Sequence, residues 1–313
     1  MDGVAGHWEG DAEPRVQATI GSAIGCVGVG LHSGRRVRLE FQPAPPGTGI
    51  VFRRTDLSVD IPARHEFVCD TRLCTQLGLP EKPEARVGTV EHVLAALSAA
   101  GIDNAVVAVD GPELPVLDGS SSPFLFLLDC AGRAVQDAPR DVIEIVRPVR
   151  VGDEHAFAEL RPGGPGFDMT LGIDFAAAAI GCQALSIRLT GKSFRRELQW
   201  ARTFTLKEEI DGLRAAGLAR GGSLENAVVV DGNRVLNPGG LRRADEFVRH
   251  KLLDAVGDLT LAGAPIWGRF IGRRSGHALN VRLLRALFAS SANWRWAPGA
   301  WNSNWAVPAA KAA

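Results

Sequence analysis

Residues 167–175 alternate strictly between apolar side chains and polar or glycine residues, and few architectures accommodate such a pattern. The apolar positions are Phe167, Met169, Leu171, Ile173 and Phe175. A period of two is typical of a strand that buries one face and exposes the other. Residues 37–41 repeat the pattern. Because half-buried strands are typical of antiparallel sheets, we expect sheets covered on one face by helices.

Helical spacing of apolar residues occurs in several segments between the expected strands. The first runs from Val90 to Leu97, with Thr89 as the predicted N-cap and Gly101 as the predicted stop. Further helices are expected at 207–216, 245–262 and 281–289, and further strands at 105–109, 143–145 and 266–271. The elements alternate irregularly, and the chain has neither a G-x-G-x-x-G nor a P-loop motif. We therefore predict an α+β fold and not a parallel Rossmann-type sheet.

The length of 313 residues predicts two domains, at roughly 150 residues per domain. A polar stretch follows the apolar residues 124–128, and we expect the domain boundary there. This stretch contains Gly132, Arg133, Gln136, Asp137, Pro139 and Arg140.

Composition excludes several classes of protein. Lys and Arg number 35 and Asp and Glu number 35, so the formal charge is zero and general binding to nucleic acid or anionic membranes is not expected. The five cysteines form no C-x-x-C pair, which excludes a zinc ribbon and a thioredoxin-type motif. We expect that the acidic N-terminus is not a signal peptide, and no apolar run reaches the length of a membrane span. We expect a cytoplasmic protein with reduced thiols.

The C-terminal segment is rich in tryptophan, with Trp294, Trp296, Trp301 and Trp305 close together. We expect it to pack on the body of the protein. An anchor at the membrane interface is the alternative, because tryptophan favours that zone.

The expected helix 245–262 places His250, Asp254 and Asp258 on one side, opposite a stripe of leucine and valine. Each helical residue advances by about 100°, so residues four apart lie one above the other. An imidazole and a carboxylate at this spacing are able to hold one divalent ion. The alternative is an ordinary solvated face, which usually lies opposite an apolar stripe.

Glu91 and His92 open the first expected helix, and His277 follows Gly276 near the C-terminus. A zinc hydrolase needs three N/O ligands, an open fourth position and a nearby carboxylate base. His92 with the pair on the later helix would supply the ligands, and Glu91 the base. His277 is a candidate general acid that Asp258 would orient; a loop histidine without a task is the alternative.

Several segments together resemble one family of enzymes. In order they are 28–34 (GVGLHSG), 89–92 (TVEH), 101–104 (GIDN), 117–120 (LDGS), 201–204 (ARTF), 221–223 (GGS), 245–254 (DEFVRHKLLD), 257–259 (GDL) and 275–280 (SGHALN). The chain resembles the UDP-3-O-acyl-N-acetylglucosamine deacetylases, zinc enzymes of lipid A synthesis in Gram-negative bacteria, over roughly residues 17 to 290. So many matches in one order favour the metal hypothesis over the solvated face.

The resemblance implies that Zn²⁺ binds the ligand set His92, His250 and Asp254. Fe²⁺ suits the same ligands, so the metal occupied in vivo stays open. It further implies that Glu91 is the base that deprotonates the attacking water. His277, supported by Asp258, would protonate the leaving amine.

The resemblance also implies roles in substrate binding. Thr203 would help to stabilise the oxyanion, and Phe204 would line the sugar site. Lys251 and Arg274 would face the diphosphate. Relatives are expected to carry lysine where this chain has Arg274, and the two cations bind phosphate differently.

The implied fold has two similar two-layer domains, each a mostly antiparallel sheet packed on helices, with the active site between them. We expect an N-terminal extension at 1–16, domain one at 17–136, domain two at 137–290 and the tail at 291–313. A β-α-β insert at about 203–236 would form a passage for the acyl chain. Its predicted wall residues, for which ordinary core packing is the alternative, are Leu206, Ile210, Ala219, Ala227 and Val229.

The implied activity is hydrolysis of the N-acetyl group of UDP-3-O-(3-hydroxyacyl)-N-acetylglucosamine with release of acetate. We expect a monomer that acts on this small molecule and needs no nucleic acid or integral membrane segment. Three alternatives remain. The first is a zinc amidohydrolase for another acylated sugar nucleotide, and the second is a catalytically silent homologue that only binds UDP-sugars or a partner protein. The third is a regulatory binding module that uses the tryptophan-rich tail.

Overall fold

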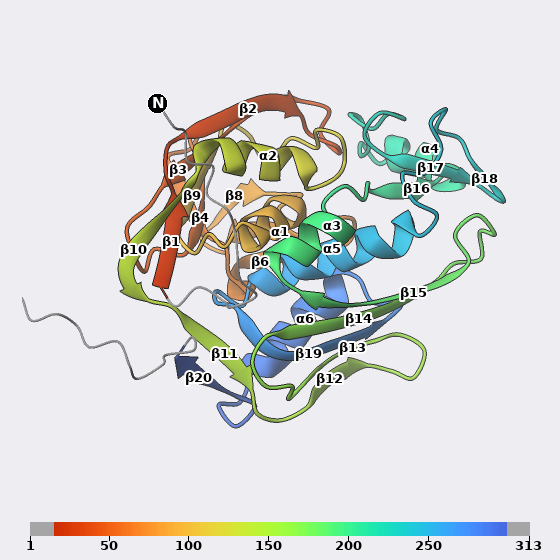
Figure 1. Cartoon of the computed structure of the whole chain (residues 1–313). Coiled ribbons are helices and arrows are strands. Elements are labelled where there is room, and N and C mark those ends of the chain that lie inside the picture. The colour runs from red at the N-terminus through yellow and green to blue at the C-terminus, as the bar shows by residue number, and fades with distance from the viewer. Residues whose placement is uncertain (1–15, 299–313) are drawn as a thin grey trace, which may run out of the picture.

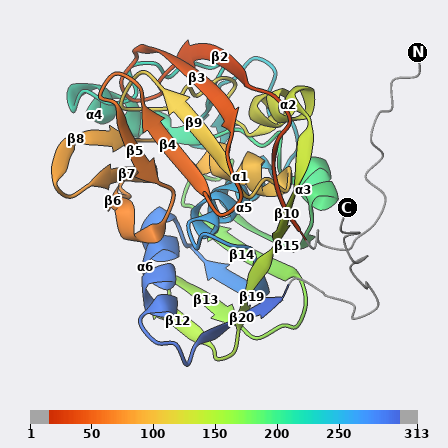
Figure 2. The same ribbon diagram turned by 90° about the vertical axis from the view of Figure 1, so that its left-hand side faces the viewer.

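The computed structural model describes residues 16–298. Over this range the chain forms a mixed α+β fold of six α-helices and twenty strands, with antiparallel and mixed sheets. Figures 1 and 2 show two large sheets with helices α1 and α5 between them. Among the described residues, no helix is both long and apolar enough to cross a bilayer.

The first large sheet has the strand order β2-β3-β9-β4-β5. Its strands are β2 (Ile24–Val29), β3 (Arg36–Pro43), β9 (Ala105–Val109), β4 (Ile50–Arg54) and β5 (Val59–Pro62). The alternation expected at 37–41 lies in β3, whose apolar side chains are buried. They join helices α1 (Glu91–Ala99) and α2 (Ser122–Ala131) in the hydrophobic core.

The second large sheet has seven strands, with β14 and β15 attached to the path β12-β13-β19-β11-β20. The bounds are β11 (Asp141–Ile145), β12 (Val149–Gly152), β13 (Phe157–Arg161), β14 (Phe167–Asp174), β15 (Cys182–Leu189), β19 (Ile266–Arg273) and β20 (Trp294–Pro298). The strict alternation at 167–175 is β14, which buries every second residue. Helices α5 (Glu246–Thr260) and α6 (His277–Phe288) pack against this sheet.

Three smaller sheets complete the described part of the chain. They are β1 (Val16–Ile20) with β10 (Arg133–Pro139); β6 (Val68–Asp70), β7 (Gln76–Leu79) and β8 (Lys82–Val87); and β16 (Phe204–Leu206), β17 (Val228–Asp231) and β18 (Arg234–Val235). Helix α4 (Lys207–Ala215) links β16 to β17, which are parallel. The short helices η1 (His65–Phe67) and α3 (Gly191–Glu197) lie in connections.

Helices α1 and α5 pack directly against each other, and a glycine makes their close contact possible. A Cβ at Gly257 would lie 2.1 Å from the carbonyl oxygen of Glu91. Only a residue without a side chain fits there, so the composition of α5 determines how closely the start of α1 approaches.

The expected helices and strands differ from the observed ones mainly at their ends. Helix α6 begins at His277, four residues before the expected start. The N-cap prediction for Thr89 is wrong: Val90 holds that position, and Thr89 adopts a left-handed φ of 58°. Helix α2 was not expected, and the polar stretch expected as a boundary contains strand β10.

The two ends of the chain are described only in part. Residues Trp294–Pro298 form β20, which pairs with β11, so this part of the tail packs on the body as expected. Trp301 and Trp305 lie outside the described residues, as does the expected N-terminal extension apart from Val16.

Candidate active site

A cavity of about 510 Å³ opens where the start of α1 meets the middle of α5. Ten of the residues singled out from the sequence line it: Glu91, His92, Thr203, Phe204, Leu206, His250, Lys251, Asp254, Arg274 and His277. Asp258 lies just behind them and is fully buried. Side chains from four separate stretches of sequence therefore converge on one space.

Local backbone features set the direction of α1. Thr89 has a φ that β-branched residues rarely adopt, and its hydroxyl donates to Glu113 Oε1 at 3.2 Å. The same Glu113 carboxylate accepts the backbone N–H groups of His32 and Ser33. One buried carboxylate thus ties the 28–34 segment to the residue that precedes the first turn of α1, and so supports a strained conformation next to the site.

Two imidazoles and one carboxylate form a compact cluster with the geometry of a metal site. The ligand atoms of His92, His250 and Asp254 all lie within 4.8 Å of one another. Asp254 Oδ1 is 3.6 Å from His92 Nε2 and 3.3 Å from His250 Nε2. Asp254 Oδ1 is also buried without a hydrogen-bond partner among the described residues. A buried carboxylate oxygen with no donor is expected to have another partner, such as a cation.

His250 is held in the orientation that a metal ligand requires. Its Nδ1 lies 3.0 Å from the carbonyl oxygen of Ala201, so Nδ1 carries the proton and Nε2 is free toward Asp254. Burial lowers the pKa of His250 to about 4. The neutral imidazole, which is the ligating form, therefore predominates at neutral pH.

Ala201 is fixed in turn by a buried ion pair. The neighbouring Arg202 donates its backbone N–H and its Nε to Glu246 Oε1, at 3.0 and 2.9 Å. Glu246, in the first turn of α5, is fully buried and Arg202 nearly so. The pair ties the segment before β16 to the helix that carries His250.

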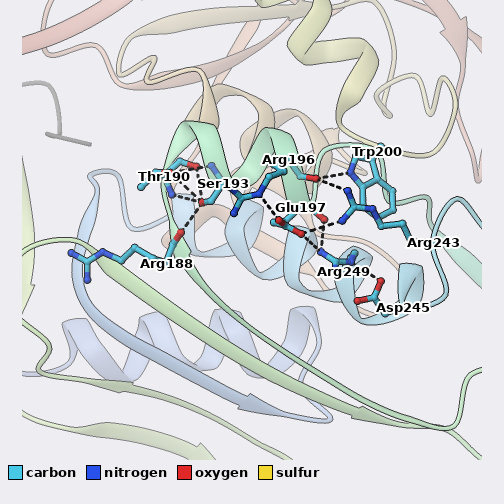
Figure 3. Close-up of polar contacts among 9 residues, drawn as sticks. All are labelled: Arg188, Thr190, Ser193, Arg196, Glu197, Trp200, Arg243, Asp245 and Arg249. Atoms are coloured by element: carbon cyan, nitrogen blue, oxygen red, sulfur yellow. Dashed lines mark hydrogen bonds and ion pairs between the residues drawn. The ribbon is translucent and has the colours of Figure 1, made fainter. Parts of the chain in front are cut away.

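A second polar network braces α5 beside the cavity (Figure 3). Arg249 donates to Asp245 Oδ1 and to Glu197 Oε2, both at 2.7 Å. Glu197 also accepts from Arg243, whose guanidinium lies over the ring of Trp200. The pairs join the end of α3 to the start of α5.

Glu91 is a buried carboxyl group at the start of α1. Its Oε2 accepts the backbone N–H of Thr75 at 3.0 Å. Burial raises the pKa of Glu91 above its ordinary value. A carboxylate with a raised pKa is a better proton acceptor near neutral pH.

His277 and Asp258 form a hydrogen-bonded pair on the other side of the cluster. His277 Nδ1 is 2.9 Å from Asp258 Oδ2, and its Nε2 is 4.0 Å from Asp254 Oδ2. Burial disfavours the charged imidazole, but the charge of Asp258 and the hydrogen bond to it prevail and raise the pKa of His277 to about 9. The charged form of this imidazole, which lines the cavity, has a proton that it is able to donate.

The remaining cavity residues lie around this centre. Lys251 Nζ donates to Asp254 Oδ2 at 2.8 Å, and Arg274 Nη1 lies 3.9 Å from Asp174. The Phe204 ring packs edge-on against Phe247 at 5.0 Å between centroids. All three side chains line the cavity, so its wall offers two cations and one aromatic ring to a ligand.

Most of the expected acyl-passage residues lie outside this cavity. Ala227 and Val229 are buried in and beside β17, and Ile210 is half-buried in α4. Ala219 has a left-handed φ of 52° in the loop that hydrogen-bonds to the 28–34 segment. Leu206 alone of the five expected wall residues lines the cavity, and the passage stays a prediction.

Sequence reasoning missed two residues of the network. Thr75 donates its hydroxyl to Asp258 Oδ1 at 2.5 Å, and Asn280 Nδ2 donates to Asp258 Oδ2 at 2.9 Å. Asn280 follows His277 by three residues, which on a helix places both on one face. Nothing in the sequence near Thr75 signals its contact, because its partner is far away in the chain.

The site defines the class of protein first: a mixed α+β metalloenzyme whose two-histidine, one-carboxylate set adjoins a carboxylate and a charged imidazole. The family follows from comparison. The model of the LpxC family, UDP-3-O-acyl N-acetylglycosamine deacetylase, matches residues 17–289, and the chain belongs to this family.

Individual relatives cover nearly the whole chain. The UDP-3-O-acyl-N-acetylglucosamine deacetylase of Phenylobacterium zucineum is 51% identical over 282 residues, which is 89% of this chain and 95% of that protein. The enzyme of the same name from Shewanella sp. strain W3-18-1 is 50% identical, with 89% and 91% covered. That of Anaeromyxobacter dehalogenans is 47% identical over 279 residues, 89% of each chain.

Proposed function

We propose that this protein hydrolyses the N-acetyl group of UDP-3-O-(3-hydroxyacyl)-N-acetylglucosamine and releases acetate in lipid A biosynthesis. The observation that carries the proposal is the buried cluster of His92, His250 and Asp254 between Glu91 and His277, in a chain of the deacetylase family. Amide hydrolysis needs an activated water, a base and an acid for the leaving amine, and the cluster offers a group for each.

The residues fit a divalent metal ion. Two neutral imidazole nitrogens and one carboxylate oxygen are the donor set of catalytic zinc sites, and Asp254 Oδ1 is buried without a hydrogen-bond donor. His92, His250 and Asp254 would hold the ion, and Zn²⁺ is the proposed metal, although Fe²⁺ suits the same ligands. When bound, the ion supplies Lewis-acid activation of water and of the acetamide carbonyl.

The chain's own residues would carry the proton transfers. Glu91 accepts the proton of the attacking water, since its carboxylate faces the cavity and its pKa is raised by burial. His277 donates a proton to the departing glucosamine nitrogen, because Asp258 keeps its imidazole charged. Thr203 lies in the cavity wall, where its hydroxyl would donate to the developing oxyanion.

Binding of the rest of the substrate is proposed for the outer wall. Phe204 offers a flat face to the sugar, and Lys251 and Arg274 offer positive charge to the diphosphate. Leu206 stands at the side of the β16–α4–β17 unit, so the acyl chain would leave the cavity there. Ile210, Ala219, Ala227 and Val229 remain proposed passage residues between β16 and the end of β17.

We propose the wider organisation on the same basis. Residues 17–136 and 137–290 would be two similar two-layer domains with the active site between them, since the first range contains all strands of one large sheet and the second contains all strands of the other except β20. Residues 1–16 and 291–313 would be an extension and a tail. The protein would act as a cytoplasmic monomer. It would need no nucleic acid, since its balanced charge disfavours binding to a polyanion.

Acetate release from UDP-3-O-acyl-N-acetylglucosamine tests the proposal. The purified protein is assayed as isolated, after chelation and after addition of Zn²⁺, with Glu91→Ala in parallel. We expect release that is lost on chelation, restored by Zn²⁺ and abolished in Glu91→Ala. A well-folded, zinc-loaded protein that releases no acetate would refute the proposed substrate and direct the search to other N-acylated sugar nucleotides.

A further inference from the structure

Thr75 forms hydrogen bonds with residues of the candidate site through its backbone nitrogen, its carbonyl oxygen and its hydroxyl group. It lies between β6 and β7, is fully buried, and does not line the cavity. Its backbone N–H donates to Glu91 Oε2 at 3.0 Å, and its carbonyl accepts the backbone N–H of Val90 at 3.3 Å. Its hydroxyl donates to Asp258 Oδ1 at 2.5 Å. One residue therefore touches the partner of His277, the carboxylate of Glu91 and the start of α1.

The contact to Asp258 completes the orientation of that carboxylate. Its Oδ2 accepts from Asn280 and faces His277 Nδ1, both at 2.9 Å, while Thr75 donates to Oδ1. The terminal torsion of an aspartate side chain is broad, so donors on both oxygens are needed to fix its plane. The plane of the Asp258 carboxylate in turn directs the His277 imidazole toward the cavity.

The contact to Glu91 likewise restricts the orientation of the Glu91 carboxylate. The terminal torsion of glutamate is equally broad, and the Thr75 N–H fixes one oxygen of Glu91. The two carboxylates belong to α1 and α5, whose starts are far apart in the chain. Because a single residue bonds to both, their relative position does not depend only on how the helices pack.

We infer that Thr75 is a positioning residue that aligns the proposed base Glu91 with the proposed acid His277, acting on His277 through Asp258. The inference rests on the proposed function. A purely structural role is the alternative, since any buried hydroxyl needs a hydrogen-bond partner. The two roles differ in what happens to turnover when the hydroxyl alone is removed.

The main variant is Thr75→Val, which replaces the hydroxyl by a methyl group of similar size. We expect kcat to fall at least about tenfold, a part of the 10²- to 10⁴-fold that positioned acids and bases contribute. KM and the affinity for Zn²⁺ should not change, because Thr75 touches neither the cavity nor the cluster of His92, His250 and Asp254. Thr75→Ser keeps the hydroxyl and should recover most of the rate. If valine prevents folding, Thr75→Ala removes the hydroxyl without adding a methyl group there.

A matched control and a double-mutant cycle separate positioning from general damage. Thr19→Val removes another buried hydroxyl, which accepts the Ala44 N–H far from the cavity, and should leave kcat unchanged. In a His277→Ala background, Thr75→Val should lower kcat by less than threefold, because its route to the reaction is already removed. A value of kcat within twofold of wild type for Thr75→Val, or an undiminished loss in the His277→Ala background, overturns the inference.

A proton NMR measurement keeps the inference testable if the proposed substrate is wrong. The Nδ1 proton shared by His277 and Asp258 should give a downfield resonance, assigned by its loss in His277→Ala. We expect it to broaden or shift upfield in Thr75→Val and to persist in Thr75→Ser and Thr19→Val. Absence of acetate release by wild type would refute the proposed function alone, whereas an unchanged resonance in Thr75→Val would refute the positioning role.

Discussion

Gly257 of α5 lies against the main chain of Glu91 in α1, so closely that a Cβ at Gly257 would be 2.1 Å from the Glu91 carbonyl oxygen. Gly257 stands between Asp254 and Asp258 on the same helix. The contact therefore joins the two helices at the level of the candidate site. The close approach lets groups on α1 and on α5 share one cavity of about 510 Å³.

Gly257→Ala should disrupt this contact. The added methyl group meets backbone and not a flexible side chain, so the helices must separate. We expect a loss of about 1–3 kcal/mol in the free energy of unfolding, as for other overpacked cores, together with weaker Zn²⁺ binding. Denaturant unfolding and metal titration measure both.

Gly212→Ala is the matched control for that experiment. Gly212 lies in helix α4 and has nothing within 4 Å of the position of an added Cβ. The change should stabilise the protein by about 0.4–1 kcal/mol, because alanine favours helix and restricts the unfolded chain. Equal effects of the two substitutions would contradict the account of Gly257.

Removal of the Asp254 carboxylate should abolish metal binding. Asp254→Ala deletes one of three ligand atoms that lie within 4.8 Å of one another and leaves two imidazoles. We expect no stoichiometric Zn²⁺ after dialysis and no rise of Tm on adding Zn²⁺, whereas the wild type should gain stability from a ligand that binds only the folded state. Stoichiometric zinc in the variant would place the metal elsewhere.

The buried pair of Arg202 and Glu246 should contribute to both stability and metal affinity. Arg202→Met leaves the fully buried Glu246 carboxylate with backbone N–H donors but without its counter-charge, which should cost about 3–5 kcal/mol. Because Arg202 fixes the neighbouring Ala201, whose carbonyl orients His250, affinity for Zn²⁺ should fall by about 10- to 100-fold. Isothermal titration with zinc and a competing chelator measures the affinity.

The exposed pair of Arg53 and Asp60 provides the comparison. Its guanidinium and carboxylate are 2.7 Å apart, and both side chains are more than 40% exposed. Arg53→Ala should cost less than about 1 kcal/mol and leave metal affinity unaltered. A larger loss from Arg53→Ala than from Arg202→Met would refute the ranking by burial.

His65 should make stability depend on pH. It is buried and stacks on Phe288 at 4.8 Å, and burial lowers its pKa, with Arg64 and Arg285 adding to the effect and Glu66 opposing it. The unfolded chain, with a histidine pKa of about 6.5, then binds more protons than the folded one below that pH. The stabilisation is complete above about pH 6.5 and is lost as the pH falls toward the lower folded pKa.

His65→Gln tests this sign. The free energy of unfolding of the wild type should fall more steeply than that of the variant between pH 7.5 and about pH 5.5, measured by urea unfolding at each pH. Parallel curves for the two proteins would show that His65 does not contribute.

The spacing of apolar residues predicted which segments form helices and strands better than it predicted where these end or what they contact. The period of two identified β3 and β14, and helical spacing identified α1, α4, α5 and α6, because one buried face repeats at a regular interval. The ends depended on non-local partners. Strand β10 forms in a polar stretch because β1 supplies its hydrogen bonds from the far end of the chain. Thr89 tolerates its left-handed φ because Glu113 holds it.

The sequence by itself determined that His250, Asp254 and Asp258 share one side of a helix, since the helical repeat alone places residues four apart together. The sequence also contains the motifs, such as residues 245–254, that identify the family. Only the tertiary structure decided that Glu91 and His92 meet that side at Gly257, that Ala201 orients His250, and that Thr75 joins Glu91 to Asp258. Such contacts join residues distant in the chain, and long-range packing leaves no periodic signal in one sequence.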